Sequence, residues 1–221
     1  MARGSTIKIN RLSPLFIACC FLISAGSADC SPQASYQIIP RVRVGAITPA
    51  TSEAALKRIY GRRNVRSTRV SLGEGEYEPG TSIYPDDPAR RIEIVWKDAR
   101  RKRFPKRIQL TGEKSIWRTR EGISLGTRLR ELERINGEPF VLLGFSWDYE
   151  GTIVSWEGGR LEREFGKDDR AVLLRLSSDQ TYGGVSDEDA SSVLGDREFP
   201  SSNPVMQRIN PKVYQIIVEF P

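Results

Sequence analysis

The side chains available for chemistry in this sequence are aromatic residues, arginines and carboxylates, because its 221 residues include no histidine. Without an imidazole, the chain lacks the usual general base of serine and cysteine hydrolases and the commonest metal ligand. It also contains no nucleotide-binding glycine loop, paired-cysteine metal motif or nucleophile-elbow motif. We therefore expect a protein that is not an enzyme and uses no cofactor or metal ion. A histidine-free hydrolase that uses carboxylates is the alternative.

Aromatic residues gather in or beside the strands that the sequence predicts. Within Phe145–Tyr149, alternation places three rings on one face of a strand, and Asp148 and Glu150 on the other. That face belongs either to the core, which ordinary packing favours, or to a binding platform. If it is a platform, large aromatic side chains are the expected apolar anchors for a partner protein. The four candidate anchors are Trp117, Trp147, Tyr149 and Trp156.

A basic run, residues 97–107, carries seven cations and one anion between two expected strands, which predicts an exposed hairpin loop. Arg100, Arg101 and Arg103 are the expected electrostatic rim of the contact surface. The run is also suited to anionic lipid or a cell-wall polymer. The opposing interpretation is that acidic residues between 74 and 87 neutralise it as a surface network.

An acidic stretch, Asp187–Glu198, has oxygen-bearing side chains at several positions that a calcium-binding loop uses. However, Ser192 stands where such a loop needs glycine, and no helix is expected on either side. We therefore predict a polar loop here and no metal site. The wider stretch 182–211 is rich in small and polar residues, which is typical of a long functional loop.

The N-terminus has the features of a secretory signal peptide over residues 1–28. Arg3, Lys8 and Arg11 precede an apolar run at 15–25, and small residues around Ala28 form a cleavage site. This apolar run is too short to cross a bilayer, and no later segment is longer. We expect a periplasmic or secreted protein with no transmembrane helix after signal removal.

Removing residues 1–28 lowers the formal net charge from +6 to +3, because this segment holds three cations and no acid. The chain's basicity is therefore poor evidence for nucleic acid, and we expect no nucleic-acid partner. Cys30 is the one cysteine left after cleavage. Its lipidation would anchor the protein to the outer membrane, but Asp29 occupies a place where lipoprotein signals carry a small residue, so simple secretion is favoured.

The rest of the chain contains a repeat. When the sequence is slid along itself until Thr51 meets Thr127, Gly61 also meets Gly137. Each copy predicts a short amphipathic helix that the threonine caps and the glycine ends. Strand-like runs follow each helix, and a last run at 213–220 would complete a sheet edge or bridge the copies. The expected strands are 65–72, 91–96 and 107–111 in the first copy, and 140–147, 152–156 and 171–177 in the second.

These elements predict an α+β fold of two tandem αβββ units. The short helices are expected to pack on an antiparallel sheet that the two units share, because neither a short helix nor a three-stranded meander is stable alone. The predicted organisation is a signal peptide at 1–28, an N-terminal segment at 29–43, a first unit at 44–114 and a second unit at 115–221.

The string Ile123–Pro139 (ISLGTRLRELERINGEP) resembles the start of the SmpA/OmlA outer-membrane lipoprotein repeat. Tandem copies of a similar unit form the β-lactamase inhibitory protein. The first copy, residues 47–61, matches less well, because Ala50 replaces a glycine and no proline follows Gly61. Gly144–Tyr149 is also similar to a segment of uncharacterised bacterial exported proteins. The resemblance implies a non-enzymatic envelope protein that binds other, unspecified proteins through its sheet face.

Overall fold

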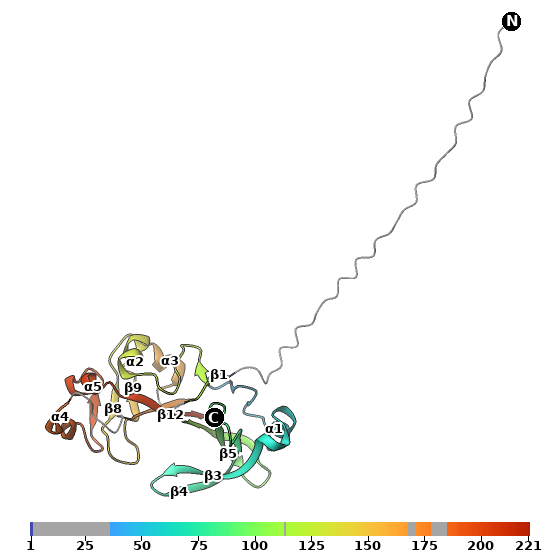
Figure 1. Ribbon diagram of the computed structural model, residues 1–221, viewed down its shortest axis with the longest axis horizontal. Helices are drawn as coiled ribbons and strands as arrows, with labels where there is room; N and C mark the ends of the chain where they lie inside the picture. The colour runs from blue at the N-terminus through green and yellow to red at the C-terminus, as the bar shows by residue number, and fades with distance from the viewer. Residues whose placement is uncertain (2–35, 113, 168–170, 178–184) are drawn as a thin grey trace. The chain divides into compact units, whose positions relative to one another are not determined.

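A computed structural model describes residue 1 and residues 36–112, 114–167, 171–177 and 185–221 (Figure 1). Short helices pack on mostly antiparallel sheets, which confirms the predicted α+β class. The described residues from 36 onward belong to one compact unit. Most of the predicted signal peptide, together with Cys30, lies outside the described residues. None of the described helices is long and apolar enough to cross a membrane.

The helices and strands follow the predicted order, with several additions. The first half contains β1 (Gln37–Ile39), β2 (Arg43–Val44), α1 (Glu53–Ile59), the 3₁₀ helix η2 (Arg62–Asn64), β3 (Val65–Gly73), β4 (Glu76–Ile83), β5 (Ile92–Asp98) and β6 (Arg103–Thr111). The second half contains β7 (Arg118–Thr119), α2 (Leu129–Asn136), β8 (Val141–Leu143), β9 (Ile153–Ser155), α3 (Arg160–Phe165), β10 (Val172–Ser177), α4 (Asp187–Ser192), β11 (Glu198–Pro200), α5 (Pro204–Ile209) and β12 (Lys212–Glu219).

The main sheet has six antiparallel strands in the order β10-β12-β6-β5-β4-β3. Its strand β12 pairs with β10 of the second unit and with β6 of the first. The C-terminal strand therefore bridges the two copies, which was one of its two predicted roles. Two smaller sheets have the orders β11-β8-β9 and β2-β1-β7, and a single bridge between Thr152 and Arg175 links the β9 region to β10.

The turn before each helix is the same in the two copies. Thr51 Oγ1 accepts a hydrogen bond from Thr48 N (2.9 Å), and Thr127 Oγ1 accepts one from Ser124 N (3.0 Å). The threonines thus close the turn, and the N-cap of each helix is the next residue along the chain. The prediction that Thr51 and Thr127 are the N-caps is therefore wrong by one residue.

Each turn also holds the start of the last strand of its own unit. Glu53 N, in α1, donates to Lys102 O just before β6, and Leu129 N, in α2, donates to Pro211 O just before β12 (both 2.9 Å). These matching contacts make β6 and β12 equivalent strands of the two units. The repeat seen in the sequence around the helices therefore extends to strands whose sequences show little similarity.

The two equivalent strands pair with each other at the centre of the main sheet. Ile108 lies opposite Val218, and Gln109 lies opposite Ile217. Because equivalent strands meet antiparallel at this point, an approximate two-fold axis between them relates the two units. One continuous sheet results, with a unit on each side of the axis.

The first unit has one strand more than predicted, because β4 occupies part of the stretch 74–87, where no strand is predicted. Pro79 and nearby glycines favour a loop in the sequence. In the structure Pro79 pairs with Arg69 of β3, but β4 pairs with β5 only from Gly80 onward. Pro79 therefore lies where β4 has a paired strand on one side only, and strands tolerate proline at such edge positions.

Residues 68–79, which we call the β3–β4 hairpin, bend over the sheet face opposite the helices. Gln109 Nε2, on β6, donates to Ser71 O (3.0 Å), and a Cβ on Gly73 would lie 3.1 Å from the Tyr149 ring. In Figure 1, α2 and α3 lie on one side of β12 and the β3–β4 hairpin lies on the other. Part of the helix-free face is therefore covered by the chain itself.

The main core lies between the helices and the other face of the sheet. The alternating side chains of β10 and β12 illustrate the division, because Leu174 and Ile216 pair and are fully buried in this core. Their neighbours Arg175 and Gln215 also pair, and alternation directs them to the helix-free face. Further core residues are Leu56, Ile94, Ile108, Leu132, Phe140, Phe165 and Val218.

Candidate functional site

Two of the predicted aromatic anchors lie in the core. Trp117 is 1% exposed, and its Nε1 donates to Arg90 O (3.1 Å). Trp156 is 5% exposed and packs between the rings of Phe140 and Phe165. Neither side chain is available to a partner in the folded protein, so the assignment of Trp117 and Trp156 as contact residues is corrected here. Trp117 comes just before β7 and Trp156 just after β9, and both belong to the hydrophobic core.

Trp147 and Tyr149 are half-buried and lie on a turn rather than a strand. Strand β8 ends at Leu143, and the positive φ of Ser146 (67°) interrupts the extended backbone. Alternation therefore fails, and Phe145 is fully buried apart from the other two rings. The prediction that all three rings share one face is wrong. Trp147 and Tyr149 pack edge to face with ring centroids 5.4 Å apart.

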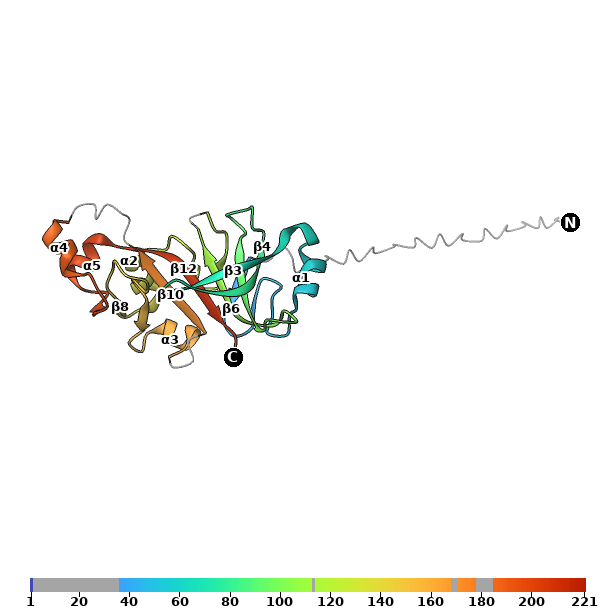
Figure 2. The same ribbon diagram turned by 90° about the horizontal axis from the view of Figure 1, so that it is seen from below.

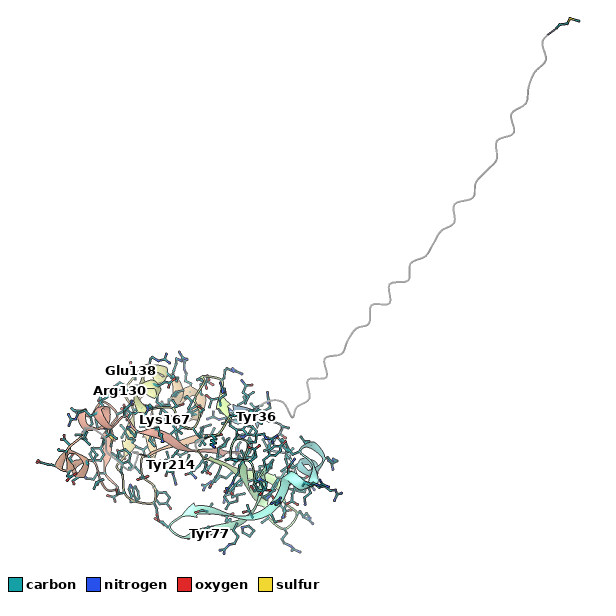
Figure 3. All side chains as sticks on the ribbon, in the orientation of Figure 1. Tyr36, Tyr77, Arg130, Glu138, Lys167 and Tyr214 are labelled. Atoms are coloured by element: carbon teal, nitrogen blue, oxygen red, sulfur yellow. The ribbon has the colours of Figure 1, made fainter. Side chains whose placement is uncertain are left out.

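These two rings join Arg175 and Tyr214 in a group that we call the aromatic cluster. The Arg175 guanidinium lies 4.9 Å from the centroid of the Tyr149 ring. Arg175 is 9% exposed, and its buried Nε has no hydrogen-bond partner among the described residues. Tyr214 lies on β12, near the middle of the view in Figure 3. The cluster thus joins strands β10 and β12 to the turn after β8.

The electrostatic environment of the aromatic cluster is mixed. Burial raises the pKa of Tyr214; Arg175 opposes this rise, while the nearby carboxylates of Glu150 and Asp148 add to it. Glu150 is itself held by Ser146 N (3.0 Å) and Ser177 Oγ (3.1 Å). The cluster therefore presents partly exposed rings beside fixed charges of both signs.

The basic run forms a second surface, because β5 and β6 are joined by a short loop, residues 99–102. Arg100 and Arg101 on this loop line a pocket of about 470 Å³, which we call the cationic pocket. Lysine and arginine side chains from α1 and η2 complete its lining, which sequence analysis missed. The basic string KRIYGRR at 57–63 is the signal that could have identified them. The lining residues are Glu53, Ala54, Lys57, Arg58, Arg62, Arg100, Arg101 and Lys102.

Glu53 holds one wall of the cationic pocket together. Its carboxylate accepts hydrogen bonds from Lys57 Nζ (2.6 Å), Lys102 Nζ (2.8 Å) and Thr81 Oγ1 (3.0 Å). Thr81 Oγ1 in turn accepts one from Trp96 Nε1 (2.9 Å). Burial raises the pKa of Glu53, but the hydrogen bonds from Lys102, Lys57 and Thr81 outweigh it, so the pKa lies below its ordinary value. The network ties α1 to β4, β5 and the loop.

Contrary to the prediction, Arg100, Arg101 and Arg103 do not form a rim around the aromatic cluster. Figures 1 and 2 both place α1, beside the cationic pocket, and β8, which leads to Trp147, on opposite sides of the view. Arg103 is not part of the pocket lining, and its guanidinium lies over the Phe104 ring at 5.0 Å. The predicted contact residues thus belong to two separate surfaces, because the two units lie on opposite sides of the central strands.

Among the described acidic residues between 74 and 87, Glu78 is the one that pairs with the basic run. Glu78 lies 3.6 Å from Lys106, outside the pocket lining. Asp86 pairs with Arg66 (2.7 Å), and Asp87 pairs with Arg90 (2.6 Å), neither of which belongs to the run. Carboxylates from elsewhere pair with Arg101 (Asp98, 3.5 Å), Lys102 (Glu53, 2.8 Å) and Arg107 (Glu219, 2.7 Å). The basic run is therefore partly neutralised, but mainly by carboxylates other than the predicted ones.

The chain matches no protein-family model, no curated protein and no solved structure. Its resemblance to the SmpA/OmlA repeat stays a prediction from Ile123–Pro139. The observations that bear on function are therefore the two surfaces themselves.

The acidic stretch at 187–198 is not the polar loop that the sequence predicts over its first half, because Asp187–Ser192 form helix α4. Ser186 caps this helix by accepting from Asp189 N (3.1 Å), and the Asp189 carboxylate lies 2.6 Å from Arg208. Across the described part of the chain, no three cysteine, aspartate or glutamate side chains lie together as a metal site requires. Of the expected functional loop at 182–211, residues 182–184 lie outside that part, and the remainder contains α4, β11 and α5 instead of one long loop.

Proposed function

We propose that this chain is an exported bacterial envelope protein that binds another protein, without catalysis, through the helix-free face of its sheet. The observation that carries the proposal is the aromatic cluster on that face. Trp147 and Tyr149 are half-exposed there, and Arg175 is held beneath the Tyr149 ring. Tryptophan, tyrosine and arginine dominate the binding energy of protein interfaces, because they bury a large area with few rotatable bonds.

The position of the aromatic cluster supports a protein partner. The tip of the β3–β4 hairpin borders it, since Gly73 lies against Tyr149. Tyr77, on the same hairpin, is 51% exposed, and the Arg69 guanidinium lies 5.0 Å from its ring centroid. Apolar rings with a charged border are the arrangement expected of an interface that forms and dissociates in water.

The carboxylates favour this proposal over a histidine-free hydrolase. Glycosidase chemistry needs two facing carboxyl groups with different protonation states. Here Glu53 accepts from Lys57 and Lys102, and Glu219 accepts from Arg107 (2.7 Å). In these contacts both carboxylates are paired with cations and not with a second carboxyl group. The pKa of Glu53 lies below its ordinary value, which makes this group a poorer proton donor.

The cellular location in the proposal rests on the sequence. Residues 1–28 have the charge and length pattern of a signal peptide, and the SmpA/OmlA-like string is that of an envelope protein. We propose a periplasmic or secreted protein, with lipid anchoring at Cys30 as the alternative. Mass spectrometry of the mature N-terminus decides between them, because a free N-terminus at Asp29 excludes a lipidated first cysteine.

Crosslinking of the tagged mature chain in native envelope extract tests the proposal, at low and at moderate salt. We expect a specific partner that the double variant Trp147→Ala/Tyr149→Ala loses and that Phe104→Ala retains. Phe104 is the matched control, because it is 41% exposed and lies at the start of β6. Both variants must first show native circular dichroism. Equal capture by wild type and the double variant would overturn the aromatic cluster as the binding surface.

A further inference from the structure

The cationic pocket holds more positive charge than its own carboxylate balances. Lys57 and Lys102 share Glu53, and Arg101 lies 3.5 Å from Asp98 with its side chain 78% exposed. The three remaining cations of the lining have no ion-pair or hydrogen-bonding side-chain partner among the described residues. These are Arg58 on α1, Arg62 on η2 and Arg100 on the loop before β6. Like charges held together are unfavourable unless an anion joins them.

The fold itself does not require this charge, as the second unit shows. The alignment of the two copies places Glu133, Arg134 and Glu138 at the positions of Lys57, Arg58 and Arg62. The second unit thus has one cation and two anions where the first has three cations. Its last strand follows Asn210 and Pro211, which are uncharged, instead of Arg101 and Lys102. The concentration of charge is therefore specific to the first unit.

The second unit also uses its own polar groups in the equivalent region. Asn210 Oδ1 accepts from Arg130 N (3.1 Å), and the Arg130 guanidinium donates to Gln207 O. These contacts connect the loop before β12 to the helix without an external ligand. In the first unit the corresponding loop carries Arg100 and Arg101, which offer donors only.

We propose that the cationic pocket binds the terminal phosphate of a phosphomonoester. Such a group has close to two negative charges at neutral pH and three oxygens that accept strong hydrogen bonds. Arg58, Arg62 and Arg100 come from three different elements around one pocket, so their guanidinium groups approach a tetrahedral anion from different directions. A phosphodiester has a single charge and two free oxygens, so it satisfies fewer of these donors.

Glu53 positions the pocket rather than repelling the ligand. Its carboxylate already accepts from Lys57, Lys102 and Thr81, so its charge is balanced within the wall. Lys102 also donates to Ser67 Oγ (2.6 Å), which fixes the loop against β3. The three unpaired arginines are thus mounted on a rigid base. The site is separate from the aromatic cluster, so it does not depend on the protein-binding proposal.

Isothermal titration calorimetry on the mature chain tests the site with inorganic phosphate, glucose 6-phosphate, dimethyl phosphate and sulfate. We expect inorganic phosphate and glucose 6-phosphate to bind at pH 7. Dimethyl phosphate should bind at least roughly tenfold more weakly than either of them. From pH 5 to 7 the affinity for phosphate should rise, because its second ionisation occurs near pH 6. Sulfate stays doubly charged, so its affinity should not rise. The pKa of Glu53 lies below its ordinary value of 4.5, so this carboxylate stays ionised over the same range.

The same titrations show which kind of molecule carries the phosphate group that the pocket recognises. Glucose 6-phosphate binding more tightly than inorganic phosphate would indicate a phosphorylated sugar, and equal binding would indicate that the phosphate group alone is recognised. Vesicles of phosphatidylglycerol, a phosphodiester lipid, serve as the competing case. If the vesicles bind and the soluble monoesters do not, the proposal is overturned in favour of a membrane surface.

Matched variants locate the binding. Arg62→Gln and Arg100→Gln should each weaken phosphate binding roughly tenfold, since a charge-assisted hydrogen bond is lost. Arg134→Gln, at the position equivalent to Arg58, should bind as wild type. These side chains are exposed, so native thermal transitions are expected for all three. Unchanged affinity in the pocket variants, or an equal loss in Arg134→Gln, would refute the site.

Discussion

Lys102 Nζ lies 2.8 Å from Glu53 Oε1, so the short loop after β5 is held directly against the first turn of α1. The backbone repeats this connection, because Glu53 N donates to Lys102 O (2.9 Å). Two basic segments that are far apart in the sequence therefore meet at one pocket. A single buried carboxylate thus decides where much of the positive charge of the first unit is displayed.

Glu53→Gln should destabilise the protein by roughly 1–2 kcal/mol at pH 7, because it removes the charge that Lys57 and Lys102 face. The pKa of Glu53 is lowered in the folded state, so its stabilising contribution is present above the unfolded value of 4.5 and is lost as pH falls through the folded value. Thermal melts of wild type and variant from pH 3 to 7 measure this. The difference in Tm should be largest near neutrality and shrink in acid; a constant difference would contradict the prediction.

Gly80→Ala should destabilise the protein by roughly 1–3 kcal/mol, because the new methyl group would lie 2.5 Å from both Ile94 O and Val70 Cγ2. Hydrogen exchange should then increase in the β3–β4 hairpin, which ends next to this residue. Ser82→Ala is the control two residues away. Its hydroxyl is buried and has no partner among the described residues, so removing it should leave stability unchanged or higher. Similar losses in the two variants would argue against the close approach as the cause.

Thr51→Val and Thr127→Val should each cost about 1 kcal/mol, because each removes the hydroxyl that closes the turn before a helix. Serine at either position keeps the hydroxyl and should restore most of the loss. Urea unfolding of the four single variants measures the effects. The two threonines should behave alike, because the approximate two-fold relation gives them the same role. A loss at one site alone would show that the turns are equivalent in geometry but not in energy.

Trp156→Ala should cost roughly 3–5 kcal/mol, because it leaves a large cavity beside Phe140 and Phe165. Trp147→Ala should cost less than about 1 kcal/mol, because Trp147 is half-exposed on a turn. Chemical denaturation of both variants provides the comparison. The opposite order would place Trp147 in the core and remove it from the proposed interface.

Several elements of the fold could be predicted because their signals are local. The helix at 129–136 follows from the spacing of Leu129, Leu132 and Ile135, and Gly137 ends it in a left-handed conformation (φ 83°). Strand β12 follows from a continuous apolar run at its centre. Strand β4 could not be predicted, because its glycines and proline signal a loop, and only pairing with β3 and β5 makes it a strand.

The candidate site was predictable in part. Arg100 and Arg101 do line a charged pocket, but Lys57, Arg58 and Arg62 were missed because they are distant in sequence from the basic run. For Trp147 and Trp156, residue type allowed both roles, and ordinary packing favoured the core for each of them. Their exposure depends on which of them lies under α2 and α3, and a positive φ at Ser146 moves Trp147 out of the strand.

The sequence by itself determined the α+β class, the internal repeat and the presence of a C-terminal strand, because hydrophobic spacing and turn residues act over a few neighbouring positions. Only the tertiary structure decided that β6 and β12 meet at a two-fold axis, that the β3–β4 hairpin covers part of the open face, and that two basic segments form one pocket. These features depend on contacts between residues far apart in the chain. Such contacts are set by packing and hydrogen bonding across the whole sheet, and they leave no local pattern in the sequence.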